Sequence, residues 1–146
     1  MIVQGGKPLC GEVFVSGMKN AALPILFATI LVGDACTLEN IPGVSDISTS
    51  LELLRQMGAQ ITYLTPTTVR IDTSYIKEGS APDELIRKMR GSSYLLGAEL
   101  GRFKKTKISW PGGCDFGGCR PLDLHLKGSV TIWMPSPMPP APWPSM

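Results

Sequence analysis

The segment Lys19-Asn-Ala-Ala-Leu-Pro-Ile-Leu-Phe-Ala28 has a counterpart later in the chain, Arg90-Gly-Ser-Ser-Tyr-Leu-Leu-Gly-Ala-Glu99. Each segment begins with a cation, continues with small residues and then becomes an apolar sequence typical of a helix. A second matching pair consists of Ser48-Thr-Ser-Leu-Glu-Leu53 and Asp123-Leu-His-Leu-Lys-Gly128. An internal repeat of this kind indicates a fold built from repeated structural units.

The first copy predicts mixed α and β structure in the order βαβαββ. Alternation between glycines predicts a first strand over Gly11–Gly17. An apolar helix follows over Ala21–Leu31, with Asn20 as N-cap, Pro24 in the first turn and Gly33 as the stop.

The rest of the first copy predicts a second helix and three further strands. We expect Asp46 to cap a helix that ends at Gly58, because three apolar residues share one face of it: Ile47, Leu51 and Leu54. The expected strands lie before and after this helix, at Ala35–Asn40, Gln60–Leu64 and Thr68–Asp72.

The second copy predicts helices and a final strand. Pro82-Asp83-Glu84 opens a helix, Met89–Ser93 interrupts it, and a small-residue helix runs from Ser92 to Gly101. Lys105–Ser109 is expected to be a strand that leads into a glycine-rich loop.

That loop, residues 110–121, contains four glycines and two prolines around a cysteine, an aspartate and an arginine. Such a run excludes a helix or a regular strand interior. Gly112 and Gly113 remove side chains just before Cys114, so the loop can present a thiol to a ligand. A glycine-rich turn around a buried cysteine is the alternative.

Composition restricts the class of protein. The chain has 146 residues, 43% hydrophobic and 18% charged, which suits one globular domain, and its net charge of +2 gives no indication of nucleic-acid binding. The apolar run Ala21–Val32 is too short to span a bilayer. Four cysteines without a C-x-x-C pair, and the single His125, favour free thiols in a reducing cytosol and no metal site. We therefore expect a soluble cytoplasmic protein that binds neither nucleic acid nor membrane.

The repeat places Lys19 and Arg90 at equivalent helix starts. A helix N-terminus with a basic residue can bind an anion. The alternative is that each cation is only a solvated residue at a helix end. Two cations at one structural position favour anion binding.

The tail interrupts the second copy. Residues 129–146 contain six prolines and no charged residue, a composition that excludes a helix and a central strand. A polyproline ligand segment is one interpretation. Because the change falls inside a repeat unit, we favour a shifted reading frame.

Four motifs together resemble a known family: Ser16-Gly-Met-Lys-Asn-Ala-Ala-Leu-Pro24, Met89-Arg-Gly-Ser-Ser93, Pro111-Gly-Gly-Cys114 and Arg120-Pro-Leu-Asp-Leu-His125. The chain from about Ile2 to Gly128 is similar to the first third of bacterial UDP-N-acetylglucosamine enolpyruvyl transferases. The resemblance implies an inside-out α/β barrel of βαβαββ units, here incomplete, with residues 1–128 as a partial domain. It also implies transfer of the enolpyruvyl group of phosphoenolpyruvate to the sugar nucleotide's 3-hydroxyl, the first committed step of peptidoglycan synthesis, without a cofactor.

The resemblance also assigns roles to residues. Cys114 matches the proton-donating cysteine that fosfomycin alkylates. Lys19, Asn20 and Arg120 match phosphoenolpyruvate contacts. Residues matching the UDP-N-acetylglucosamine site are Arg90, Arg120, Pro121, Leu122, Asp123 and Leu124.

Two departures from the family pattern matter. Five residues separate Cys114 from Arg120 where the family usually has four, so Cys119 or a neighbouring glycine resembles an insertion. The family's general base and a further phosphate-binding arginine lie beyond the matched part. The alternatives are therefore an inactive truncated fragment and, less favoured, a 5-enolpyruvylshikimate-3-phosphate synthase, which lacks the Pro-Gly-Gly-Cys loop.

Overall fold

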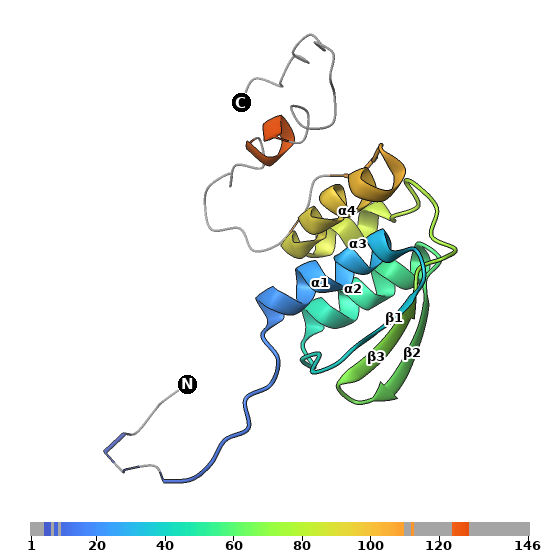
Figure 1. Cartoon of the computed structure of the whole chain (residues 1–146). Coiled ribbons are helices and arrows are strands. Elements are labelled where there is room, and N and C mark those ends of the chain that lie inside the picture. The colour runs from blue at the N-terminus through green and yellow to red at the C-terminus, as the bar shows by residue number, and fades with distance from the viewer. Residues whose placement is uncertain (1–4, 7, 9, 110–111, 113–123, 129–146) are drawn as a thin grey trace.

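The computed structural model of the chain describes residues 5–6, 8, 10–109, 112 and 124–128 (Figure 1). Its elements in chain order are α1 (Lys19–Val32), β1 (Ala35–Leu38), α2 (Ser45–Gln56), β2 (Gln60–Thr65), β3 (Thr68–Asp72), α3 (Asp83–Lys88), the 3-10 helix η1 (Arg90–Ser93) and α4 (Tyr94–Phe103). Residues 124–128 are also helical.

The three strands form one antiparallel sheet in the order β1-β3-β2. Asp72 of β3 is level with Ala35 of β1 and with Gln60 of β2. Val69 and Ile71 of β3 are buried while Arg70 between them is exposed, as expected for a strand covered on one face. The strand pairs predicted at Gln60–Leu64 and Thr68–Asp72 are confirmed, with β2 one residue longer.

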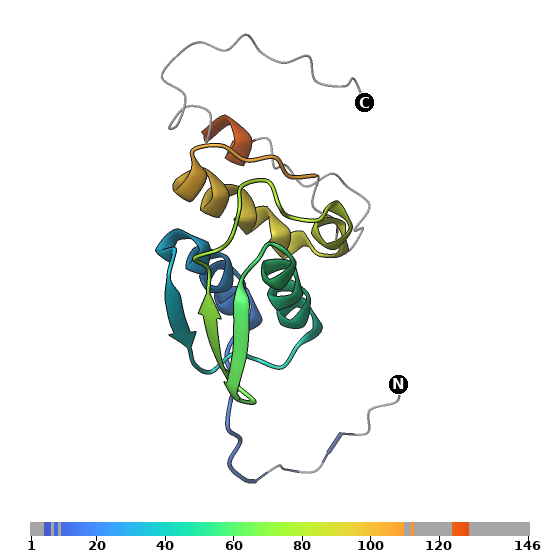
Figure 2. The same cartoon turned by 90° about the vertical axis from the view of Figure 1, so that its right-hand side faces the viewer.

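The helices form two layers on that face of the sheet. Helix α1 contacts β1 and α2 contacts β2, while α4 contacts α1 and α3 contacts α2 from the other side (Figures 1 and 2). The middle layer explains the composition of α1, since a helix that is apolar nearly all round must be covered on more than one side. The fully buried core residues come from both helical layers and the sheet, and include Leu26, Phe27, Ile30, Leu53, Leu54, Ile71, Ile86 and Leu95.

Helix α1 starts earlier than the sequence predicted. It begins at Lys19, so Asn20 is its second residue and Met18 is the N-cap, without a capping side chain. Pro24 therefore lies inside the helix rather than in its first turn. The predicted stop is confirmed, because Gly33 adopts a left-handed conformation with φ of 68°.

Two predicted strands are wrong. Neither 11–17 nor 105–109 is a strand, and β1 ends at Leu38 rather than at Asn40. In the part of the chain that is described, the first copy is therefore αβαββ. Residues 11–17 carry the alternating pattern, but a strand also requires a hydrogen-bonded neighbour, and neither segment has one among the described residues.

Helix α2 begins at Ser45, with Val44 as N-cap, so the prediction that Asp46 caps it is wrong. Its predicted apolar face is confirmed, because Ile47, Leu51 and Leu54 are all buried. In the second copy, the helix predicted to open at Asp83 and the interruption after it are both confirmed. Helix α4 begins at Tyr94, two residues later than predicted.

Arg102 of α4 joins three segments that are distant in sequence. Its guanidinium donates to the carbonyl oxygens of Ile30 (3.0 Å) and Thr73 (2.7 Å), and at 3.4 Å to that of Ser74. The Thr73 hydroxyl in turn donates to the carbonyl oxygen of Thr29 at 2.9 Å. The end of α1, the end of β3 and the end of α4 are thereby held together.

Three apolar side chains of α1 remain about half exposed among the described residues. Ile25, Leu31 and Val32 are 50%, 53% and 56% exposed. No helix in the described part of the chain has the length and apolarity needed to cross a membrane.

Candidate functional site

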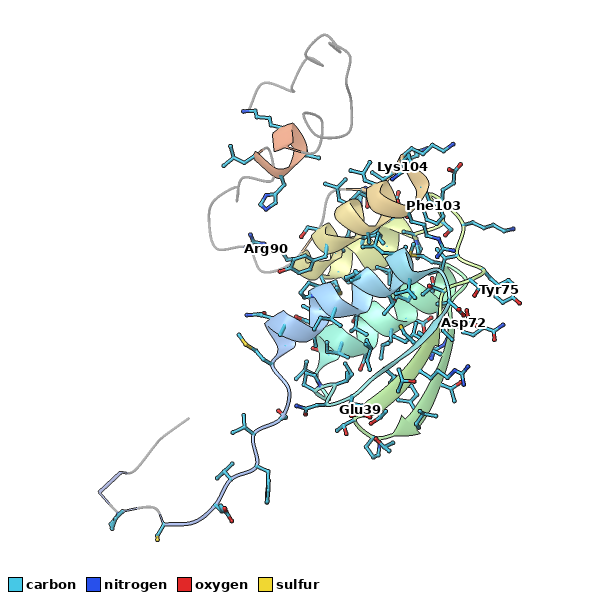
Figure 3. All side chains as sticks on the ribbon, viewed as in Figure 1. Glu39, Asp72, Tyr75, Arg90, Phe103 and Lys104 are labelled. Atoms are coloured by element: carbon cyan, nitrogen blue, oxygen red, sulfur yellow. The ribbon has the colours of Figure 1, made fainter. Side chains whose placement is uncertain are left out.

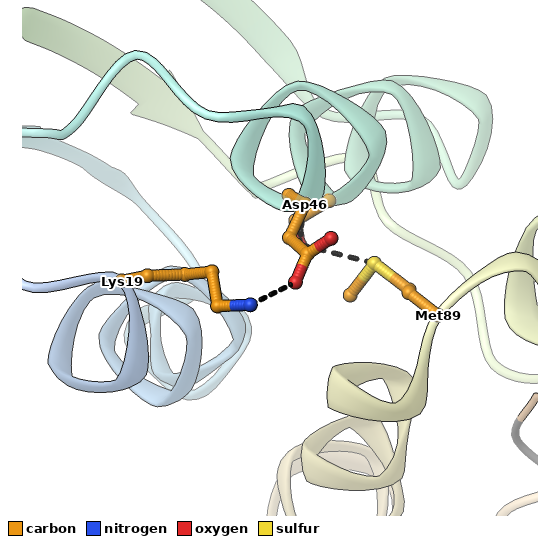
Figure 4. A network of polar contacts seen from close by, with 4 residues as sticks. Lys19, Asp46 and Met89 are labelled. Atoms are coloured by element: carbon orange, nitrogen blue, oxygen red, sulfur yellow. Dashed lines mark hydrogen bonds and ion pairs between the residues drawn. The ribbon is translucent and has the colours of Figure 1, made fainter. Parts of the chain in front are cut away.

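The first turns of α1 and α2 meet through an ion pair. Lys19 Nζ lies 2.8 Å from Asp46 Oδ2, and both side chains are partly exposed (Figure 4). Because Lys19 and Asp46 are the first and second residues of their helices, the pair places both helix starts at the same end of the fold. Exposed pairs of this kind contribute only about 0–1 kcal/mol, so stability alone does not explain a cation here.

The start of η1 reaches the same end. The Ser50 hydroxyl oxygen of α2 lies 3.5 Å from Met89 Sδ (Figure 4). Gly91 packs next to Leu23 of α1. Arg90, between Met89 and Gly91, is exposed and points away from the core at this end (Figure 3). Lys19 and Arg90, the two cations predicted to bind an anion, thus both lie at helix starts at this end of the fold.

The backbone at this end also favours an anion. The first N–H groups of a helix have no partner within the helix. At the N-caps of α1 and η1, Met18 and Met89, no side chain makes a capping hydrogen bond. Each of these two helix starts combines a basic residue with backbone N–H groups that no side chain caps, and Asp46 sets the position of the Lys19 ammonium.

The glycine-rich loop begins against helix α3. The Gly112 N–H donates to the Ile86 carbonyl oxygen at 3.4 Å. A Cβ at this position would overlap the Arg87 carbonyl oxygen, so only glycine fits. Arg90 follows directly after this end of α3, which brings the start of the loop to the same region as Arg90.

The remaining predicted site residues are placed only in part. Asn20 is exposed in the first turn of α1, and Leu124, in the helical residues 124–128, is 65% exposed. Five predicted site residues lie outside the described residues: Cys114, Arg120, Pro121, Leu122 and Asp123. That these five residues lie in one site with Lys19 and Arg90 stays a prediction.

Asp46 is the site residue that sequence reasoning missed, because it was interpreted as a helix cap. The signal that could have found Asp46 is its position. Asp46 and Lys19 each lie at the start of a predicted helix in the first copy of the repeat. Within the described ranges, no group of three His, Cys, Asp or Glu side chains could hold a metal ion.

Comparison with known proteins identifies the family. The sequence model described as EPSP synthase (3-phosphoshikimate 1-carboxyvinyltransferase) matches residues 3–130, and the chain belongs to this family. Among its relatives, the UDP-N-acetylglucosamine 1-carboxyvinyltransferase 1 of Clostridium acetobutylicum is 47% identical over 87% of this chain and 30% of its own length. The UDP-N-acetylglucosamine 1-carboxyvinyltransferases of Hamiltonella defensa and Coxiella burnetii are each 46% identical, over 86% and 88% of this chain. The resemblance inferred from the motifs is confirmed.

The chain spans about 30% of the length of the curated relatives that it matches. Among solved structures, the enolpyruvyl transferase NikO from Streptomyces tendae matches with a TM-score of 0.58 and 29% identity. That match covers 66% of this chain and 22% of the solved chain. The mixed α/β fold with a small sheet is therefore that of an enolpyruvyl transferase segment.

Proposed function

We propose that this chain forms part of an enzyme that transfers the enolpyruvyl group of phosphoenolpyruvate to the 3-hydroxyl of UDP-N-acetylglucosamine, an early step of cell-wall synthesis in the cytoplasm. The observation that carries the proposal is the 46–47% identity to UDP-N-acetylglucosamine 1-carboxyvinyltransferases over nearly nine-tenths of the chain. The basic residues at the starts of α1 and η1 support it, because both substrates are anionic.

Lys19 and Asn20 are proposed to bind phosphoenolpyruvate together with Arg120. Lys19 supplies a point charge, whereas Arg120 supplies a planar fork that can donate two parallel hydrogen bonds to a phosphate or carboxylate. Arg90 is proposed to bind UDP-N-acetylglucosamine together with Arg120, Pro121, Leu122, Asp123 and Leu124.

Cys114 is proposed as the proton donor. An ordinary thiol has a pKa of about 8.5 and is therefore mostly protonated near neutral pH, so it can protonate the methylene carbon of an enol ether. Neighbouring cations would lower the pKa of the thiol and make it more nucleophilic, which would account for alkylation by fosfomycin. The fixed position of Gly112, two residues earlier, supports a defined origin for this loop.

We further propose that residues 1–128 form two units of an inside-out α/β barrel and that residues 129–146 are an irregular segment outside it. The internal repeat supports the two units, although the first lacks its initial strand among the described residues.

A chimaera tests the proposed function. Residues 3–128 replace the matching part of the Coxiella burnetii relative, and phosphate release from phosphoenolpyruvate is measured with UDP-N-acetylglucosamine and with shikimate 3-phosphate. Turnover with the sugar nucleotide that Cys114→Ala abolishes supports the proposal. Turnover only with shikimate 3-phosphate, or none in a folded chimaera, contradicts it.

A second proposal concerns the 146-residue chain by itself, which we expect to have no turnover. Catalysis between two substrates requires groups that surround them and exclude water. The described residues offer Lys19 and Arg90 on one side, and the half-exposed apolar side chains of α1 support a chain that needs further structure to cover them. Phosphate release by the purified chain above that of Cys114→Ala would contradict this second proposal.

A further inference from the structure

Glu99 is a carboxylic side chain in the core. It lies in the second half of α4 and is 0% exposed. Acidic side chains are almost never fully buried unless they are paired. No ion pair involves Glu99 in the part of the chain that the structure describes.

The polar contact of Glu99 leads to the segment after α4. The Thr106 hydroxyl donates a short hydrogen bond to Glu99 Oε2. The other oxygen, Oε1, is buried and has no hydrogen-bond partner among the described residues. Thr106 belongs to residues 104–109, which connect α4 to the glycine-rich loop and pair with no strand.

The groups around Glu99 leave its charge uncompensated. Burial raises the pKa of Glu99, and the nearby Glu78 carboxylate raises it further. The Thr106 hydroxyl and the backbone N–H groups of Gly79 and Lys107 act in the opposite direction and only in part offset the increase in the pKa.

Two cations of the neighbouring segments, Lys105 and Arg102, contact other groups. Lys105 Nζ lies 2.8 Å from Glu78 Oε1, and the Arg102 guanidinium donates to Ile30 and Thr73. Helix α1, which packs against α4, carries one charged residue, Lys19. Lys19 is the first residue of α1, whereas Arg102 of α4 contacts Ile30 near the end of α1.

We propose that Glu99 is a proton-controlled tether: as a neutral acid it holds residues 104–109 against α4, and when it ionises it releases them. An ionised carboxylate without a cation is costly in the core, because the Thr106 hydroxyl and the backbone N–H groups of Gly79 and Lys107 offset the loss of hydration only in part. Admitting water relieves that cost, and the element that moves most easily is the segment without strand pairing.

The direction of the pH dependence follows from the raised pKa. The folded state binds the Glu99 proton more tightly than the unfolded state does, whose reference value is 4.5. The stabilisation by the tether is therefore complete below 4.5 and is lost as pH rises through the raised pKa of the folded state. On the proposed function, residues 104–109 lead to Cys114, so Glu99 is a positioning residue for that thiol; the tether itself does not depend on that function.

Amide hydrogen exchange of the 146-residue chain, read by mass spectrometry and corrected for the intrinsic rate at each pH, tests the proposal. We expect protection of 104–109 to fall about tenfold across the titration, which corresponds to the loss of about one hydrogen bond. The peptide that contains β3 reports global unfolding and should stay protected. Glu99→Gln should keep 104–109 protected at every pH.

Two variants that keep Glu99 should shift, in opposite directions, the pH midpoint at which residues 104–109 lose their exchange protection. Glu78→Gln removes a charge that raises the pKa, so the midpoint should fall; Thr106→Val removes a donor that lowers it, so the midpoint should rise. A general loss of stability would move both midpoints in the same direction.

Two outcomes overturn the tether. One is protection of 104–109 that does not change with pH in the unmodified chain, and the other is a shift of both midpoints in the same direction. Because exchange requires no substrate and no turnover, failure of the tether is distinguishable from failure of the chimaera to release phosphate.

Discussion

The two copies of the internal repeat begin alike but differ in what surrounds them. In the first copy, α1 and α2 are backed by the sheet β1-β3-β2 on one side and by α3 and α4 on the other. In the second copy, the described residues contain α3, η1 and α4 and no strand. The same kind of sequence therefore gives a middle-layer helix in one place and an outer-layer helix in the other.

The difference shows what an alternating pattern can and cannot specify. Residues 60–65 and 68–72 become strands because the two-residue turn at Pro66 and Thr67 brings them together locally. Residues 11–17 alternate as well, but no nearby turn supplies them with a partner among the described residues. Strand formation thus depends on a neighbour as much as on the residues themselves.

The largest expected effect is the loss of the aromatic side chain of Phe27. Phe27→Ala should lower the free energy of unfolding by about 3–5 kcal/mol, because a fully buried ring leaves a cavity in the middle layer. Leu95→Ala, in the outer-layer helix α4, should cost less, about 2 kcal/mol. Urea unfolding followed by circular dichroism measures both. A loss in the free energy of unfolding for Leu95→Ala that equals or exceeds that for Phe27→Ala would contradict the distinction between the middle-layer helix and the outer-layer helix.

Arg102 is the contact that joins the two copies. Arg102→Met should cost about 2–3 kcal/mol, because the carbonyl oxygens of Ile30 and Thr73 lose a charged donor. Arg55→Met, which removes only an exposed pair with Glu52, is the matched control and should cost under about 0.5 kcal/mol. The same urea titrations apply, and similar losses for the two variants would show that Arg102 does not join the copies.

Two glycines of the second copy should respond in opposite directions. Gly112→Ala should cost about 1–2 kcal/mol, because its Cβ would overlap the Arg87 carbonyl oxygen. Gly97→Ala, in the exposed face of α4 with no atom near the new Cβ, should stabilise by about 1 kcal/mol. Thermal unfolding of the two variants measures the contrast. Stabilisation by Gly112→Ala would mean that the glycine-rich loop does not start against α3.

The smallest effect concerns cysteine reactivity. Burial, and then the Asp72 carboxylate, raise the pKa of Cys36 above 9.0, whereas Cys10 is exposed. The raised pKa reduces the thiolate fraction of Cys36 and its side chain is half-buried, so it should react more slowly with iodoacetamide than the exposed Cys10 does. Peptide mass mapping over time measures both rates, which should become similar in urea. Faster reaction at Cys36 in the folded chain would contradict its half-buried position in β1.

Much of the fold could be predicted from local signals. Gly33 as a helix stop, the apolar face of α2 and the break at Met89 all follow from residues within one or two turns of each other, and all three are confirmed. The cap at Asn20 was wrong because an apolar pattern does not mark where polar residues join a helix, and Lys19 already belongs to α1.

The sequence indicated the two basic residues of the candidate site but not Asp46, the partner of Lys19. Lys19 and Arg90 were singled out because the repeat gives them the same position in two copies, and their binding of an anion stays a prediction. The contact of Lys19 with Asp46 depends on how α1 packs against α2, and no local pattern specifies that distance. The buried Glu99 was hidden for the same reason, since its sequence position in an amphipathic helix resembles that of an exposed acid.

The Arg102 contacts also bear on the speed of folding and unfolding. Arg102 meets Ile30 and Thr73, residues far from it in the chain, so most of the chain must be ordered before these hydrogen bonds form. Contacts of this kind are expected to be absent from the transition state for folding. Arg102→Met should therefore accelerate unfolding while leaving the refolding rate nearly unchanged, a result that stopped-flow measurements would show as a shift of the unfolding arm alone. In kinetic terms, Arg102 acts late, and it sets how long the folded chain persists rather than how quickly it forms.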